Sequence, residues 1–218
     1  QGAHPAGIYK MLTGYNPRST VTHPELGAWV NKCLTSEQDS LPNFVSIGRG
    51  RSGSAGFFPG QWAALPVKSP DKGIDFIQRN KSVNEDGFEN RLDILASLNK
   101  DFDKDYGTKD TRSYVDSYAG SLKFMKSKDI DAFELKNENP NIVSLYDRNE
   151  FNRSCMLAGR LVERGVRFVK VTLGGWDYHD GIYQKMPANA NKLDKGLSAL
   201  LKHLKLKGLL ETTLVVVS

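Results

Sequence analysis

A short loop, Gly174-Gly175-Trp176-Asp177-Tyr178-His179-Asp180, carries the residues of this chain that are best suited to chemistry. Asp177 and His179 are two positions apart, so their side chains can point the same way where the backbone is extended. A carboxylate oxygen and an imidazole nitrogen suit zinc or a similar divalent ion, and the two glycines let the backbone turn sharply. The D-x-H pattern alone leaves a second interpretation open, a polar structural loop whose histidine is satisfied by hydrogen bonds.

The segments on either side of this loop predict a strand–helix–strand unit. The apolar run at residues 166–172 predicts a buried strand. We expect a helix from about residue 189 to 207, ended by Gly208, and a strand at 213–218 that closes a right-handed crossover between parallel strands. The loop would then follow the carboxyl end of a strand, where open α/β sheets collect ligands and catalytic groups.

The remainder of the chain predicts further helices and short strands. Pro66 assigns residues 64–67 to a sheet edge, because proline cannot donate to a ladder, and Thr22 is expected to cap the second helix. The lysine-rich stretch 100–109 is expected to be a solvated connection. Besides 64–67, the pattern predicts a strand at 44–47 and helices at 5–12, 23–34, 88–102, 111–125 and 150–164, the last ended by Gly165.

The composition is that of a globular chain with room for one sizeable core. It has 218 residues, of which 39% are hydrophobic and 25% charged. No stretch is long and apolar enough to span a membrane. The net charge of +5 is dispersed, so it predicts no nucleic-acid partner and is compatible with a small anionic one. Cys33 and Cys155 both fall in predicted helices and are expected to be buried thiols.

Three other histidines offer weaker candidates. His4 precedes a helix and could lie beside an anion held at that helix N-terminus, although a histidine so placed is commonly exposed. His23 is expected to be a surface or packing residue. His203 lies on a lysine-bearing face and is expected to be solvated. The chain has no G-x-S-x-G elbow, C-x-x-C pair or P-loop.

Three stretches of the chain resemble a known family. The strings HPAGIYKMLTGYNPRSTVTHPELGAWVNK, FNRSCMLAGRLVERGVRFVKVTLGGWDYHD and LDKGLSALLKHLKLKGLLETTLVVVS are similar to a bacterial family of sulfatase-like proteins, domain-of-unknown-function family 1501, which is placed in the alkaline phosphatase superfamily. The resemblance implies an α/β fold, an alkaline-phosphatase-like α/β/α sandwich with a mostly parallel sheet. It implies one domain over residues 1–218 with a variable helical insertion at about 73–149, and we expect it to be incomplete at both ends.

The resemblance also implies an activity, a metal-dependent hydrolysis of phosphate or sulfate esters on a small anionic substrate. Asp177 and His179 match the family's W-D-x-H-D motif and take over its metal-ligand role. Asp180 takes over a ligand role or that of a partner that orients His179. The implied cofactor is a divalent metal, zinc first, with calcium or manganese as alternatives. The implied location is exported, periplasmic or at the cell surface.

The N-terminal string resembles the end of the sulfatase signature C-x-P-S-R-x-x-L-x-T-G. Counting back from Thr13 puts His4 at the position of the modified cysteine or serine, and Ala6-Gly7-Ile8 replace Pro-Ser-Arg. A formylglycine route is therefore not available, and His4 is expected to be a metal ligand, a group that binds the substrate anion, or a nucleophile, in that order. The family's D-G-G-like and E-F-G-R segments are not in this sequence. The competing hypotheses are a non-catalytic binding or scaffold protein, and an anion- or glycan-binding surface that uses aromatic and arginine residues of 49–62.

Overall fold

Three short parallel strands form the centre of the molecule. The computed structural model describes residues 4–36, 39–50, 53–75, 77 and 82–218. The strands are β1 (Phe44–Ile47), β2 (Leu65–Val67) and β3 (Phe168–Val171), in the order β2-β1-β3. Val45 of β1 is paired with Leu65 on one side and Val169 on the other. Three of the four predicted strand positions are confirmed, including the placement of the proline-containing strand at an edge, although β3 is half-buried rather than buried.

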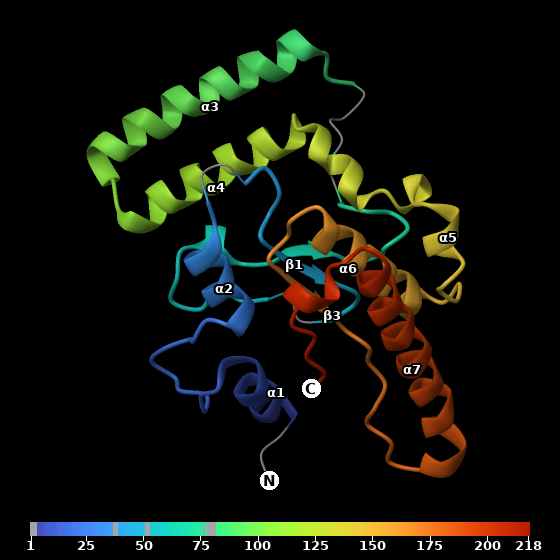
Figure 1. Ribbon diagram of the computed structural model, residues 1–218. Coiled ribbons are helices and arrows are strands. Elements are labelled where there is room, and N and C mark those ends of the chain that lie inside the picture. Colours follow the sequence, from blue (N-terminus) through green and yellow to red (C-terminus); the bar gives the residue numbers. More distant parts are fainter. Residues whose placement is uncertain (1–3, 37–38, 51–52, 76, 78–81) are drawn as a thin grey trace.

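Helices surround this sheet on several sides (Figure 1). Helix α6 packs against β3 and against α7, and α2 contacts β1 and β3, while α1 lies at the opposite end of the molecule from the α3–α4 hairpin. The helices are α1 (His4–Thr13), α2 (Leu26–Leu34), α3 (Glu85–Tyr106), α4 (Lys109–Met125), α5 (Pro140–Val143), α6 (Glu150–Glu163) and α7 (Ile182–Leu206). None of the helices in the described ranges is both long and apolar enough to cross a membrane.

Helix α6 and strand β1 supply the best-buried side chains of the core. Asn149 caps α6 by accepting a hydrogen bond from the backbone N–H of Asn152, and Gly165 ends it with a φ of +94°. The hydrophobic core is formed by residues from β1, β2, α6, α7 and the turns before α6, chiefly Val45, Ile47, Val67, Phe133, Leu135, Met156, Leu157, Leu161 and Ala199.

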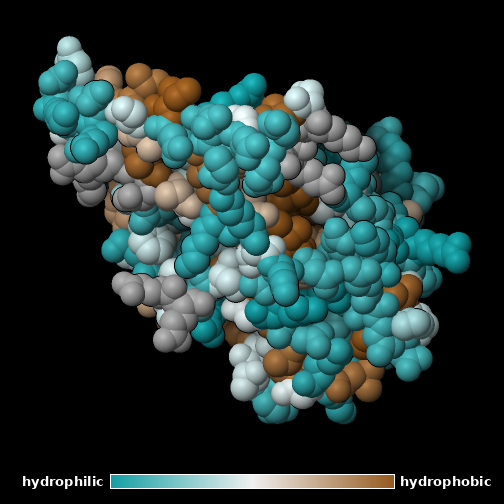
Figure 2. Space-filling view, turned by 90° about the horizontal axis from the view of Figure 1, so that it is seen from above, coloured by the Kyte–Doolittle hydropathy of each residue, from teal (hydrophilic) through white to brown (hydrophobic). Residues whose placement is uncertain are grey.

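The α3–α4 hairpin covers little of this core. Seen from the side of the hairpin, hydrophilic side chains dominate the surface and hydrophobic ones show between them (Figure 2). Ile94, Leu98 and Phe102 of α3 are all at least half exposed. The expectation that residues 100–109 form a solvated connection is wrong in part, because α3 continues to Tyr106 and only a short turn joins it to α4.

Helix α2 begins three residues later than predicted. Thr22 does not cap it; Glu25 holds the N-cap position, with extended backbone angles and no side-chain cap hydrogen bond. The carboxylate of Glu25 instead accepts a hydrogen bond from Lys170 Nζ of β3, at 2.8 Å. In a capping box begun by Thr22, the side chain of Glu25 would have bonded back to the backbone of Thr22. In the structure that side chain forms a buried ion pair with the sheet instead.

The last part of the chain differs most from the prediction. Helix α7 begins at Ile182, earlier than predicted, and it continues through Pro187, which removes one backbone donor. The strand predicted at 213–218 is wrong: after a 3-10 turn at Leu210–Thr212 the chain pairs with none of the strands that the structure describes. Leu214 is 88% exposed and Val216 is 69% exposed, so the predicted crossover does not close. The fold is a mixed α/β arrangement with a small, open, three-stranded parallel sheet.

Candidate functional site

The loop at residues 174–180 leaves the carboxyl end of β3, as the sequence predicts. Thr172 donates its backbone N–H to Ile47 O at 3.1 Å, and Gly48 donates its backbone N–H to Val67 O at 2.9 Å. These hydrogen bonds connect the carboxyl ends of the three strands at one edge of the sheet. A Cβ on Gly48 would lie 3.1 Å from Thr172 O, which shows how closely the two chain segments approach after β1 and β3. The candidate residues therefore follow the edge of the sheet where α/β folds place their ligands.

The structure brings His4, Asp177 and His179 together. His179 Nε2 lies 2.9 Å from Asp177 Oδ2, and His4 Nε2 lies 3.5 Å from the same oxygen. The three side chains are open to solvent, with 72% of His4, 57% of Asp177 and 80% of His179 exposed. One carboxylate oxygen is thus shared by two imidazoles that are 175 residues apart in the sequence.

Hydrogen bonds to its own backbone and to α7 hold this loop in place. Gly175 has a φ of +85°, which a residue with a side chain rarely adopts. Asn189 of α7 donates its side-chain N–H to Gly175 O at 2.7 Å, and Trp176 Nε1 donates to Leu173 O at 2.9 Å. No sequence pattern marks Asn189 as part of the site, because its role depends on the tertiary approach of α7 to the loop.

Asp180 lies in the same loop and makes its ion pair elsewhere. Its carboxylate accepts a hydrogen bond from Lys185 Nζ in the first turn of α7. The oxygen that bonds His179 belongs to Asp177. The structure therefore places the orienting contact on Asp177, and it uses Asp180 to join the loop to α7.

The donor set has the chemistry of a partial metal site. Two ligands of a tetrahedral zinc ion at bond lengths of about 2.0–2.2 Å lie about 3.3 Å apart, and the two imidazole–carboxylate distances, 2.9 and 3.5 Å, lie on either side of that value. Within the described residues, however, no group of three or more His, Cys, Asp and Glu side chains is arranged to hold a metal ion. Asp177 and the two imidazoles therefore have donor atoms of the right chemistry and two suitable separations, but among the described residues they are not arranged as a three-ligand site.

The remaining candidates of the sequence analysis lie apart from this cluster. His23 is a packing residue, as predicted: Tyr9 Oη lies 2.7 Å from its Nδ1, and Tyr15 stacks on its ring with centroids 4.2 Å apart. Arg49 is exposed and lies 3.8 Å from Glu150. Arg51, which the glycan- or anion-binding hypothesis also used, lies outside the described residues.

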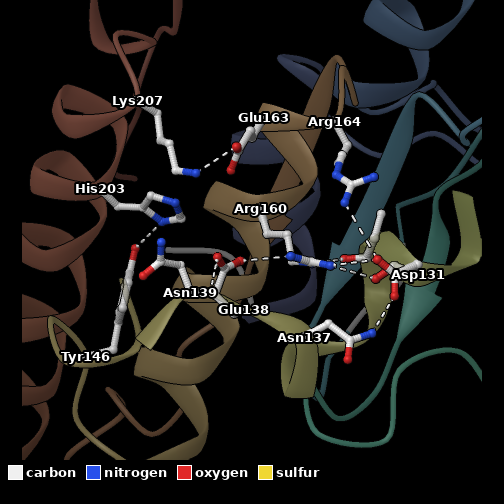
Figure 3. A network of polar contacts seen from close by, with 11 residues as sticks. Asp131, Asn137, Glu138, Asn139, Tyr146, Arg160, Glu163, Arg164, His203 and Lys207 are labelled. Atoms are coloured by element: carbon white, nitrogen blue, oxygen red, sulfur yellow. Dashed lines mark hydrogen bonds and ion pairs between the residues drawn. The ribbon is translucent and has the colours of Figure 1, made fainter. Parts of the chain in front are cut away.

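The prediction for His203 is wrong. Its side chain is fully buried between α6 and α7, and its Nδ1 lies 3.0 Å from Tyr146 Oη (Figure 3). Burial lowers the pKa of this imidazole below its ordinary value. The lysines around His203 misled the prediction, because a glycine on α6, Gly159, leaves the space that the ring fills.

The strongest electrostatic cluster of the described residues is structural and lies away from the loop. Arg160 of α6 is almost fully buried and reaches Glu138 Oε2 at 3.2 Å and Asp131 Oδ2 at 3.1 Å (Figure 3). It also donates to the backbone carbonyls of Ala132 and Asp131, both at 3.0 Å. These contacts connect α6 to the turns at 128–138, and a sequence pattern does not reveal them because the partners are 22–29 residues away.

Comparison with known proteins shows a family. No curated protein and no solved structure matches this chain. A family model described as "Protein of unknown function (DUF1501)" matches residues 1–218. The match includes both α1, which carries His4, and the loop with Asp177 and His179. The chain belongs to the DUF1501 family.

Proposed function

We propose that this protein is a metal-dependent hydrolase of phosphate or sulfate esters, with an alkaline-phosphatase-like arrangement of its sheet and helices. The observation that supports the proposal is the convergence of His4 and His179 on one oxygen of Asp177, beside the carboxyl end of a parallel strand. Nitrogen and oxygen donors of this kind suit zinc first, and calcium or manganese as alternatives. An exported location, in the periplasm or at the cell surface, is part of this proposal.

In this proposal each residue has a defined task. Asp177 and His179 hold the ion, with Asp177 Oδ2 and His179 Nε2 as neighbouring donor atoms 2.9 Å apart. His4 completes the donor set or binds the anionic group of the ester, and Asp180 keeps the loop against Lys185. A bound divalent ion would supply Lewis acidity and a hydroxyl-type nucleophile at neutral pH.

A non-catalytic binding or scaffold protein is the second candidate, and one observation favours it. The three side chains are more than half exposed, whereas catalytic electrostatics gain strength where water is excluded. A scaffold would keep its partner binding when Asp177 and His179 are replaced.

A hydrolysis screen tests the first candidate against the second. The purified protein, supplied with zinc, calcium or manganese, is assayed on 4-nitrophenyl phosphate and 4-nitrophenyl sulfate. We expect turnover that falls at least about 100-fold in His179→Ala, in line with loss of a metal ligand's support. Asp105→Ala, an exposed substitution on α3, is the matched control and should retain activity. Turnover that is equal in wild type and His179→Ala would contradict the proposal.

A further inference from the structure

A cluster of aromatic rings lies next to α1, on the side of the molecule that carries His4. Tyr15 stacks on His23 with centroids 4.2 Å apart and planes 7° apart, and Phe57 meets the edge of the same imidazole at 6.4 Å. Phe57 continues the cluster to Trp29 at 6.3 Å. We call the following residues the aromatic surface: Tyr9, Tyr15, His23, Trp29, Phe57 and Phe58.

Several of these rings are exposed although the cluster is rigidly held. Tyr15 and Phe57 are each 54% exposed, and Trp29 is 42% exposed. Because one face of the Tyr15 ring lies flat on His23, the exposed part of that ring includes the opposite face. The backbone at Gly56 is fixed against His23, since a Cβ there would lie 2.3 Å from the carbonyl carbon of His23. The ring–ring contacts hold these side chains against one another, which limits the entropy lost on binding.

The segment that carries most of the aromatic surface, residues 4–36, has more exposed cations than anions. In residues 4–36 the only acidic residue is Glu25, and its buried carboxylate is paired with Lys170. Lys32 places its Nζ 5.2 Å from the centre of the Phe58 ring, and Lys10 and Arg18 are exposed on the same segment. A ligand that covers these rings therefore meets cations and no free carboxylate from this segment, which favours an anionic partner.

We infer that the aromatic surface binds an acidic polysaccharide, with the flat, apolar face of a sugar ring stacked on Tyr15 and the acidic groups of the chain beside Lys10, Arg18 and Lys32. A flat, amphipathic ring face suits a partner that is apolar on its faces and polar at its rim. A sugar ring has that shape. Single-stranded nucleic acid also stacks on aromatic rings, but its binding uses a charged groove that tracks the backbone, and the cations here are three dispersed side chains.

This binding surface lies near the candidate site and does not depend on it. Helix α1 is about 15 Å long at 1.5 Å per residue, with His4 at its first position, Tyr9 along it and Tyr15 just beyond its end. A polysaccharide chain that stacks on Tyr15 would therefore have to extend along about one helix length to reach His4. The inference goes beyond the proposed hydrolase, because binding at the aromatic surface requires neither a metal nor turnover.

Calorimetric titration with dextran sulfate, in buffer that contains EDTA, tests the inference on the whole chain. Tyr15→Leu removes the stacking face and keeps an apolar side chain, whereas Tyr15→Phe keeps the ring. We expect wild type and Tyr15→Phe to bind alike, and Tyr15→Leu to bind at least about fivefold more weakly. Tyr106→Leu, at an exposed tyrosine on α3, is the matched control and should bind like wild type. Near-ultraviolet circular dichroism verifies that each variant is folded.

Three outcomes would overturn the inference. One is the absence of dextran sulfate binding by the folded wild type. Another is binding that is unchanged in Tyr15→Leu, or bound dextran sulfate that polyphosphate of equal charge displaces with the same efficiency as free dextran sulfate. Either result would indicate that binding depends on attraction of charge alone. The third is tighter binding of an oligo(dT) single strand with the same dependence on the Tyr15 ring, which would indicate base stacking. EDTA removes metal-dependent steps, so failure here leaves the proposed hydrolase untouched.

Discussion

Replacement of Arg160 by methionine should destabilise the protein more than any surface substitution. The guanidinium is only 7% exposed and makes four polar contacts, two with carboxylates and two with backbone carbonyls. Methionine preserves most of the apolar stem packing but leaves Glu138, whose side chain is 3% exposed, without its cation. Removal of one partner from a buried ion pair costs about 3–5 kcal/mol, equivalent to a fall in melting temperature of roughly 6–20 °C for a chain of this size.

Urea unfolding of four proteins measures this cost: wild type, Arg160→Met, Glu138→Gln and the double variant. Since Glu138→Gln removes the buried negative charge, the double variant should lose less free energy of unfolding than the sum of the two single variants, with a coupling of about 1–3 kcal/mol. Arg18→Met, an exposed arginine, should change stability by no more than about 0.5 kcal/mol. A loss below about 1 kcal/mol in Arg160→Met, or no coupling in the cycle, would refute the reasoning that the pair is buried and interdependent.

Three further predictions concern the packing between α6 and α7 and the two thiols. The pKa of His203 is lowered by burial, so the unfolded chain binds this proton before the folded chain does as the pH falls below about 6.5. The free energy of unfolding should therefore fall with decreasing pH, by up to about 1.4 kcal/mol per pH unit, and His203→Gln should reduce that slope. Equal slopes for wild type and His203→Gln in urea titrations between pH 7 and 5.5 would contradict this prediction. Gly159→Ala would bring a Cβ within 2.4 Å of the buried His203 ring and should cost about 1–3 kcal/mol by thermal unfolding, while Gly120→Ala, with open space around it, should be neutral or stabilising; equal losses would show that the space is not limiting. Burial raises the pKa of Cys155 to about 12, whereas Cys33 is exposed. Ellman's reagent should therefore modify Cys33 rapidly and Cys155 only after unfolding. Rapid modification of both thiols in the folded protein would contradict the burial of Cys155.

The strongly periodic elements were predictable from the sequence. Helix α6 has an asparagine at its N-cap and Gly165 after its end, and both signals act within one turn of the helix. The strands β1 and β3 are short apolar runs, and β2 contains the proline that restricts it to an edge. In each case local chemistry and tertiary position agree.

The other features depend on contacts between distant segments. Glu25 ends up as an ion-pair partner of Lys170 rather than in a capping box, and Cys33 is exposed, contrary to the prediction that both thiols are buried. The buried residues of α7 are Gly196, Ala199, His203 and Leu204, and the position of His203 among them follows from the close packing of α7 on α6. The strand predicted at 213–218 had the right composition, but a strand also needs a partner, and β3 pairs with β1 alone.

The candidate site shows the same division. The loop position after β3 followed from the apolar run and the glycines, and Asp177 and His179 are hydrogen-bonded as their spacing allows. Sequence spacing could not place His4 beside Asp177, because that contact requires α1 to pack against a loop at the far end of the chain. The role of Asp180 also depends on Lys185, which α7 contributes only because it begins earlier than predicted.

Metal content tests the central claim most directly. The protein is purified, supplied with zinc, dialysed and analysed by elemental mass spectrometry, together with the double variant Asp177→Ala/His179→Ala and the control Asp105→Ala. If Asp177 and His179 hold a catalytic ion, wild type and control should retain about one zinc per chain, and the folded double variant should retain none. Equal zinc in all three folded proteins, or no zinc in wild type, would contradict the account and identify the loop as a structural element.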